Sequence, residues 1–561
     1  MAKPLATSKD NLGKAVDIAV PGKKVAENAF SGAITLISAD LIGSADSHGV
    51  EEIGEGAFED CLSLSRVQAR DDVKIGPYAF ADCLSLSNAW FYDHRNGLLQ
   101  VGTIGEGAFQ ECRSLAYVNL RSKGIGKMAF QNCTALKKCE VDELEEIGDL
   151  AFDGCGSLRS VTMPSKVGQY AFRDCTSLTE VIVQEGPHHY ISPGTFSGCT
   201  ALASVTIPDS ILFIQENAFW GCSALKSVQT TATTIGEHAF QISGLESIKI
   251  GDGADLRRHA FANCHRLRDV EGRIGTIGPM AFKECTSLQS ITLPTRVYPY
   301  AFYGCRGLTE VVVPDQTREI ASGTFEGCTA LASVEIPESV FSINESAFKN
   351  CEALESVRTN ANIIRQSAFK DCHALKSVIL TYTSPETVLI HEGAFKRCYA
   401  LEEVVIAAKK VQIGPKAFAN CVSLKVVTVP ENSSIYSTAF QGSSVEKLVV
   451  LGELGQHKQY LNEFIESEEG IVESEEGNVE GYYSAKDNPL KIMGWTAANH
   501  KVLPENDKEK ARTILFSLQR NVASDRLPHV PQEMRQMMFK PQPSDVYTKS
   551  TQRLNDRVAP E

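Results

Sequence analysis

The most constraining feature of this chain is a repeated dipeptide. Ala-Phe, or in two places Thr-Phe, recurs at intervals of 20 to 29 residues. In 16 of the 19 copies a Cys follows the Phe by three residues, which accounts for all but one of the 17 Cys. A unit of this length cannot bury a hydrophobic core alone, so successive units must stack and share one core. The repeated Phe residues, 19 of the 25 in the chain, are Phe30, Phe58, Phe80, Phe109, Phe130, Phe152, Phe172, Phe196, Phe219, Phe240, Phe261, Phe282, Phe302, Phe325, Phe348, Phe369, Phe395, Phe418 and Phe440.

Each unit has two parts with different expected conformations. The segment L-x-x-V-x-I, as in residues 202–207, is rich in β-branched residues and alternates apolar with polar at its end. It predicts a short strand with one buried face. The segment I-G-x-x-A-F-x-x-C is too short for an independent helix, so we expect one or two helical turns packed by the Phe. Stacking would place the strands in one long parallel sheet, ~4.8 Å apart.

The complete unit, as in Ile104–Cys112 (IGEGAFQEC), resembles the BspA-type (Treponema-type) leucine-rich repeat. The resemblance implies an α/β fold, a leucine-rich-repeat solenoid of parallel strands and short helical turns. It covers residues 21–450 as about 19 units, after an N-terminal segment or cap at 1–20. Members of that family occur on bacterial surfaces and in protists, usually as ligand- or protein-binding surfaces without enzymatic activity.

A second order of repetition is present on top of the first. The stretch 194–210 (GTFSGCTALASVTIPDS) returns 129 residues later as 323–339 (GTFEGCTALASVEIPES). A block of about six units was therefore duplicated. Ile182 and Val312 are equivalent under this duplication, and we expect them to make paired contacts.

The regular spacing of the cysteines is interpreted as structural. The chain has no C-x-x-C pair and no Cys/His knuckle, so neither a closed zinc site nor a local disulfide is indicated. Ser243 and Ser443 occupy the same position in two units, which indicates a slot for a small buried residue. Buried thiols suit a reducing compartment. Together with the lack of an apolar signal-peptide core in the first twenty residues, this predicts a cytoplasmic or nuclear protein.

Catalytic motifs are missing from the sequence. There is no phosphate-binding G-x-x-x-x-G-K-S/T loop, no H-E-x-x-H and no G-x-S-x-G. The twelve His are scattered, and the pair His188-His189 is interpreted as part of a solvated loop. We therefore expect no enzyme, no cofactor and no metal. The net charge of −14 argues against a nucleic-acid partner, and no apolar run reaches the ~18 residues of a membrane span.

The remaining function is protein binding on the outward strand positions, which should line the concave face of the solenoid. Aromatic residues are frequent anchors of interfaces, and the sequence offers one aromatic and two aliphatic groups there. The alternative is that these residues only cover neighbouring strands. The candidate partner-binding residues are Trp90, Phe91 and Tyr117, then Ile182 and Val312, then Ile379, Val405 and Val449.

The chain changes character after the last repeat. Residues 451–481 are predicted to be an acidic linker, with eight Glu and no Lys or Arg in 463–480. Residues 482–540 are predicted to form a small helical tail, because apolar residues recur with helical spacing from 511 to 522, and 541–561 are expected to be disordered.

The leading interpretation is that the protein, whose oligomeric state is unknown, is a non-enzymatic scaffold for a protein partner of unknown identity. The alternatives are a substrate receptor of a ubiquitin ligase, using an F-box-like tail, and a surface adhesin.

Overall fold

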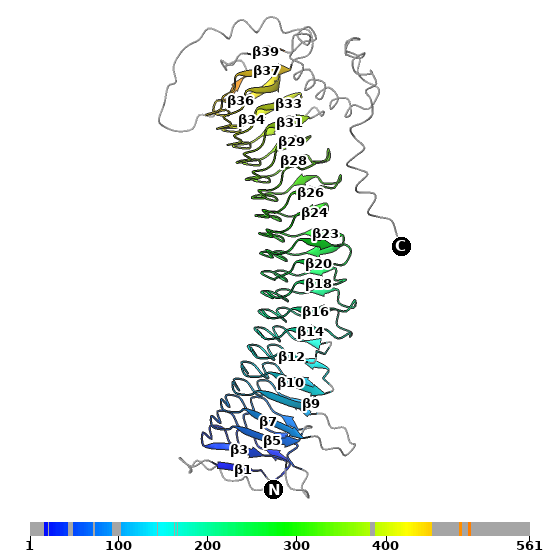
Figure 1. The fold of residues 1–561 in the computed structure, drawn as a ribbon, viewed down its shortest axis with the longest axis vertical. Helices are drawn as coiled ribbons and strands as arrows, with labels where there is room; N and C mark the ends of the chain where they lie inside the picture. Colours follow the sequence, from blue (N-terminus) through cyan, green and yellow to red (C-terminus); the bar gives the residue numbers. More distant parts are fainter. Residues whose placement is uncertain are drawn as a thin grey trace.

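The structure is a computed structural model that describes residues 16–20, 22–42, 49–70, 73–92, 102–142, 144–161, 163–164, 166–381 and 387–451, with two short segments at 482–484 and 492–494. Figure 1 shows these residues wound into a long, slightly bowed column, with β1 at one end and β37 and β39 at the other. No helix within the described residues is long and apolar enough to cross a membrane. The predicted solenoid is thus present, and most of the predicted tail lies outside the described residues.

Most units contribute two strands, and the strands of successive units stack into two columns; in the unit of Phe325 an isolated bridge at Glu335 replaces the long strand. The long-strand column contains the predicted L-x-x-V-x-I strands. Its members are β1 (Val16–Ala19), β3 (Leu36–Asp40), β5 (Arg66–Arg70), β7 (Asn88–Tyr92), β9 (Tyr117–Ile125), β10 (Lys138–Asp142), β12 (Ser160–Val161), β14 (Glu180–Ile182), β16 (Ser204–Thr206), β18 (Ser227–Gln229), β20 (Ser247–Lys249), β22 (Asp269–Glu271), β24 (Ser290–Thr292), β26 (Glu310–Val312), β29 (Ser356–Thr359), β31 (Ser377–Thr381), β33 (Glu403–Ala407), β35 (Val426–Pro430), β37 (Lys447–Leu451) and β39 (Ile492–Gly494).

In most units the short-strand column includes the Ile of the I-G step, or the aliphatic residue in its place, and this column was not predicted. Many of its strands have two residues, of which the second is buried, as in β19. Its members are β2 (Lys24–Val25), β4 (Glu52–Ile53), β6 (Lys74–Ile75), β8 (Gly102–Ile104), β11 (Glu146–Ile147), β13 (Lys166–Val167), β15 (Tyr190–Ile191), β17 (Phe213–Ile214), β19 (Thr234–Ile235), β21 (Ala254–Leu256), β23 (Ile274–Ile277), β25 (Arg296–Val297), β27 (Glu319–Ile320), β28 (Ser342–Ile343), β30 (Ile363–Ile364), β32 (Val388–Ile390), β34 (Lys410–Ile413), β36 (Asn432–Tyr436) and β38 (Tyr482–Ser484).

Pairing within both columns is parallel, with one antiparallel pair among the described strands. β9 is long enough to take part in both columns, because it pairs with β10 in one and with β8 and β11 in the other. The antiparallel pair joins β36 to β38, and β39 continues the other column in parallel. These two strands lie within the range predicted to be a helical tail. The described part of that range therefore extends the sheets rather than forming a helix.

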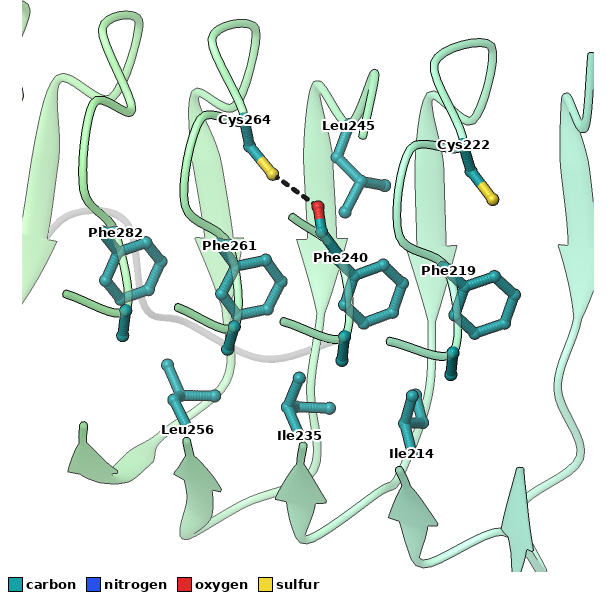
Figure 2. Close-up of a cluster of buried hydrophobic side chains, with 14 of the residues drawn as sticks. Ile214, Phe219, Cys222, Ile235, Phe240, Leu245, Leu256, Phe261, Cys264 and Phe282 are labelled. Atoms are coloured by element: carbon teal, nitrogen blue, oxygen red, sulfur yellow. Dashed lines mark hydrogen bonds between the residues drawn. The ribbon is translucent and has the colours of Figure 1, made fainter. Parts of the chain in front are cut away.

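The core between the two columns is built on the repeated Phe side chains. From Phe30 to Phe440 every neighbouring pair is stacked, with ring centroids 5.0–5.8 Å apart. Figure 2 shows four of these rings in a row, with the aliphatic residues of the short strands on one side and Leu245 on the other. Since rings in an offset stack attract one another and exclude water, this Phe ladder is the continuous core that a single unit cannot provide.

The segments around each Phe are turns, so the predicted helical turns are wrong. In most units two residues flank the Ala-Phe with positive φ, as His238 (56°) and Ile242 (60°) do around Phe240. Left-handed residues cannot continue an α-helix. Instead, the Phe240 N–H donates to the Ala260 carbonyl of the next unit (2.8 Å). The described residues thus contain strands and turns but no helix, and the fold is a leucine-rich-repeat β-solenoid rather than α/β.

The cysteine prediction is confirmed, and the structure adds its reason. All 17 Cys are free and buried. In each repeat the Sγ donates to the carbonyl oxygen of the Phe one unit earlier, as Cys264 does to Phe240 (3.0 Å; Figure 2). Ser443, which occupies the same slot, donates its hydroxyl to the Phe418 carbonyl at 2.5 Å. The slot therefore holds a small side chain. The Cys residues of the repeat and Ser443 donate from it to the preceding unit, whereas the Ser243 hydroxyl lies 3.2 Å from the Cys264 Sγ of the following unit.

Candidate binding surface

The outer face of the long-strand column consists of the residues on either side of each buried central residue. In β14, for example, Val181 is buried whereas Glu180 and Ile182 are exposed. The same exposed–buried–exposed pattern occurs in β18, β24 and β26. The candidate partner-binding residues were predicted to lie on this outer face. Most of its other positions are polar, such as the Ser that opens β16, β18, β20 and β24.

The aromatic candidates Trp90 and Tyr117 both lie on this outer face. Trp90 is 47% exposed in β7 and Tyr117 is 39% exposed in β9. The Tyr117 hydroxyl donates to Glu140 at 2.5 Å, and Glu140 also forms an ion pair with Lys138. The hydrogen bond to Glu140, with some desolvation, raises the pKa of Tyr117 to about 12. Tyr117 is thus held in place as a neutral phenol, and its register partner in β7 is Asn88, two residues before Trp90.

Phe91 does not share a strand position with Trp90. In the register of β5 and β7, Trp90 pairs with Gln68 and Phe91 with Ala69, which is fully buried. The expectation that Phe91 belongs to the aromatic group stays a prediction. The side chain of Phe91 itself lies outside the described residues.

The duplicated pair Ile182 and Val312 is exposed in both copies. Their exposures are 55% and 51%, and each ends a short strand of the long-strand column. The pairing around them also matches, because Ile182 lies beside Thr206 and Val312 forms an isolated bridge with Glu335 one unit on. Two aliphatic side chains are therefore presented alike at equivalent places of the two blocks.

The third group of candidates is at least partly wrong. Val405 is only 3% exposed, because β33 buries Val405 and Ala407 on its outer side as well as Val404 and Ile406 on its core side. The next strand shows the same burial at Thr428. Ile379 and Val449 are half-buried. This end of the column is therefore not an open face, and Val405 is a packing residue.

Sequence reasoning also missed exposed apolar residues on the short-strand column. Tyr190 and Phe213 are register partners in β15 and β17 and are 40% and 44% exposed. They were missed because only one strand per unit was expected. The signal that could have revealed them is the buried Ile that follows each of them five residues before the ladder Phe, a position that recurs in most units. Because that Ile points to the core, the preceding side chain lies on the outside.

The strand columns, the Phe ladder and the turn geometry define the class of this protein as a leucine-rich-repeat solenoid. The family model described as the BspA type leucine rich repeat region (six copies) matches overlapping segments at residues 11–137, 102–226, 145–268, 226–299, 258–376, 295–408 and 357–463. The chain therefore belongs to the BspA-type leucine-rich-repeat family, as the repeat motif predicted.

Three of the solved structures that the chain matches come from bacteria. A leucine-rich repeat protein from Bacteroides ovatus is 23% identical, with 71% of this chain and 88% of that chain covered and a TM-score of 0.43. A leucine rich cell surface protein from Faecalibacterium prausnitzii is 19% identical over 80% and 93% of the two chains, with a TM-score of 0.23. The T. pallidum leucine rich repeat protein is 21% identical over 47% and 82%, with a TM-score of 0.19. No curated protein matches the chain.

Proposed function

We propose that this protein is a non-enzymatic scaffold that binds a protein partner through the outer face of its long-strand column. The observation that carries the proposal is the exposure of Trp90 and Tyr117 on a regular strand surface that is otherwise largely polar. Large aromatic side chains that keep nearly half their surface in water are the residues that gain most from burial in an interface. Stacked repeats form extended concave binding surfaces, and we assign that role to this face.

The duplication supports a partner that makes contact at more than one place. Ile182 and Val312 are six units apart, which corresponds to roughly 30 Å at the spacing of paired strands. Each provides an exposed aliphatic side chain in the same local setting. A partner with two similar contact points about 30 Å apart would use both blocks, and linking two weak contacts raises the overall affinity.

We further propose that the protein works in the cytoplasm or nucleus, without a cofactor and without nucleic acid or membrane as its target. The free, buried thiols support a reducing compartment. A ubiquitin-ligase receptor would need the residues after 494, which lie outside the described structure, and an adhesin would need export. Both alternatives are distinguished by the proteins that the chain captures.

Replacing Trp90 by Ala should weaken partner binding at least ~30-fold, the loss expected of an aromatic hot spot. The melting temperature should not change, because truncating an exposed side chain has little effect on stability. The measurement is affinity capture from lysate of the source cell with quantitative mass spectrometry, followed by titration of the purified partner. Trp220→Ala is the matched control, since Trp220 is also exposed (38%) but lies in a turn, away from the strand face.

The expected result is one set of proteins retained by the wild type and by Trp220→Ala and depleted by Trp90→Ala. An identical set in all three samples would refute this face as the binding surface. Capture of ligase subunits that depends on residues after 494 would favour the ubiquitin-receptor function instead.

A further inference from the structure

A row of side chains on one edge of the solenoid brings two histidines together. The position two residues before each ladder Phe from Phe30 to Phe418 has positive φ, and in the units of Phe240 and Phe261 it is occupied by His238 and His259. Their rings are stacked, with centroids 4.8 Å apart and planes inclined by 24°. The same position in the next unit is Met280. Since the row follows the repeat, residues 21 apart in sequence become neighbours.

The imidazole of His238 is oriented by groups on both sides. Its Nδ1 lies 2.5 Å from the Gln241 Oε1, so Nδ1 carries the hydrogen and donates it. The other ring nitrogen, Nε2, lies 3.4 Å from the Glu237 Oε1. A metal-binding His is commonly held in this way, with one ring nitrogen donating to an oxygen acceptor and the other free to ligate.

His259 lacks the partner that its neighbour has. The residue equivalent to Gln241 in its unit is Ala262, and the Nδ1 of His259 is buried without a hydrogen-bond partner among the described residues. Its Nε2 lies 3.0 Å from the Met280 Sδ. A buried ring nitrogen with no partner costs free energy. The Nδ1 of His259 therefore has unused bonding capacity, and the Nε2 on the other side of the ring faces a thioether.

We propose that Glu237, His238 and His259 bind one late first-row transition-metal ion, Cu(I) in preference to Zn²⁺, with Met280 as an additional soft ligand. One ligand atom from each of the first three residues lies within 4.8 Å of the others. Metal bonds of ~2.0–2.3 Å bring two ligands to about 4 Å or less, so small side-chain rotations close the site.

The choice of metal follows from the donors and from the local charge. Imidazole and thioether are poor ligands for Mg²⁺ and Ca²⁺, and thioether sulfur selects Cu(I). The Arg258 Nε lies 3.7 Å from the Glu237 Oε1 and contributes a positive charge. This guanidinium partly neutralises the Glu237 carboxylate, so the site has less negative charge with which to attract a divalent ion. Cu(I) therefore fits this site better than Zn²⁺.

The second block of units provides an internal comparison. Gln366 and Ser367 stand where the first block has Glu237 and His238, and Gly393 stands where it has His259. The same backbone positions thus occur without ligands. The proposed site would therefore occur in the first block only. It would link two adjacent repeat units, because Glu237 and His238 come from one unit and His259 from the next.

The test is a titration of the full chain with Cu(I) under anaerobic conditions, in competition with bicinchoninate, and in parallel a titration with Zn²⁺. The site variants are His238→Asn and His259→Asn, because Asn tolerates positive φ and Asn217 already occupies this row at φ 55°. The matched control is His265→Asn, an exposed His of the unit that contains His259. Melting temperatures of all variants verify that each is folded.

Wild type and His265→Asn should retain one equivalent of Cu(I) that both site variants lose, with affinity lowered at least ~10-fold. Met280→Leu should weaken Cu(I) but not Zn²⁺. Equal retention by all of these proteins would overturn the site, because the copper would then be held elsewhere, for example by thiols. Tighter binding of Zn²⁺ than of Cu(I) would overturn the proposed preference.

Discussion

The solenoid should unfold on raising the pH from about 9 to 10, without added denaturant. In an unfolded chain Cys titrates near pH 8.5. In the folded chain desolvation raises the pKa of Cys139 and Cys264 to about 12, and it holds the pKa of Cys133 and Cys155 well above the usual range. The pKa of sixteen buried thiols is raised, with desolvation as the largest cause in fourteen of them and a hydrogen bond to the neighbouring thiol as the largest cause in Cys61 and Cys83. The sixteen are Cys61, Cys83, Cys112, Cys133, Cys139, Cys155, Cys175, Cys199, Cys222, Cys264, Cys285, Cys305, Cys328, Cys351, Cys372 and Cys398.

The sign of this effect follows from proton linkage. Because the pKa of these thiols is higher in the folded state, their stabilising contribution is complete below the unfolded pKa and is lost as the pH rises toward the folded one. Between the two values each thiol costs about 1.4 kcal/mol per pH unit. Sixteen thiols titrating together cost about 20 kcal/mol per pH unit, whereas a typical protein has only about 5–15 kcal/mol of stability.

Thermal unfolding curves recorded from pH 7 to 10 test this expectation. A variant in which Cys199, Cys222, Cys264 and Cys285 are all replaced by Ser should lose stability about one quarter less steeply with pH. Ser443 shows that Ser fits this slot and keeps the hydrogen bond to the preceding unit. A melting temperature that stays constant to pH 10, or rapid alkylation of the thiols in the folded protein at pH 8, would contradict the argument.

The core was predictable because the Phe and Cys recur once per repeat. In a stacked solenoid, residues at the same position of successive repeats lie in one row. The short-strand column was not predictable, because strands of two residues such as β17 and β19 are too short to show an alternating pattern. The turns were mistaken for helical turns for a related reason. Their left-handed positions are occupied by residues as different as Met128, Leu150 and Tyr170, so no residue type marks the break.

The candidate surface was predictable only where strand alternation decides exposure. That rule places Trp90 and Ile182 outside correctly, but it also placed Val405 there, because nothing in a single strand indicates that its outer side is covered. The His238–His259 pair depends on register between units rather than on a local motif. Its signal was the separation of 21 residues, which equals the spacing of Phe240 and Phe261.

Replacing Phe240 by Ala should lower the free energy of unfolding by about 3–5 kcal/mol, the range for a buried Phe. The ring is fully buried and is stacked on Phe219 (5.1 Å) and Phe261 (5.5 Å). Its removal leaves a cavity and also breaks two stacking contacts, each worth about 0.5–1.5 kcal/mol. The measurement is urea unfolding at pH 7, with Phe213→Ala as the control. Phe213 is 44% exposed, and its loss should cost less than about 1 kcal/mol.

The position of Phe240 near the middle of the ladder adds a second readout. In a solenoid each unit contacts only its neighbours, so cooperativity depends on every interface in the row. A cavity between Phe219 and Phe261 should weaken the coupling of the two halves, and the urea m-value should fall as the halves begin to unfold separately. An unchanged m-value with a loss below about 1 kcal/mol would mean that the two strand columns, rather than the Phe ladder, hold the units together.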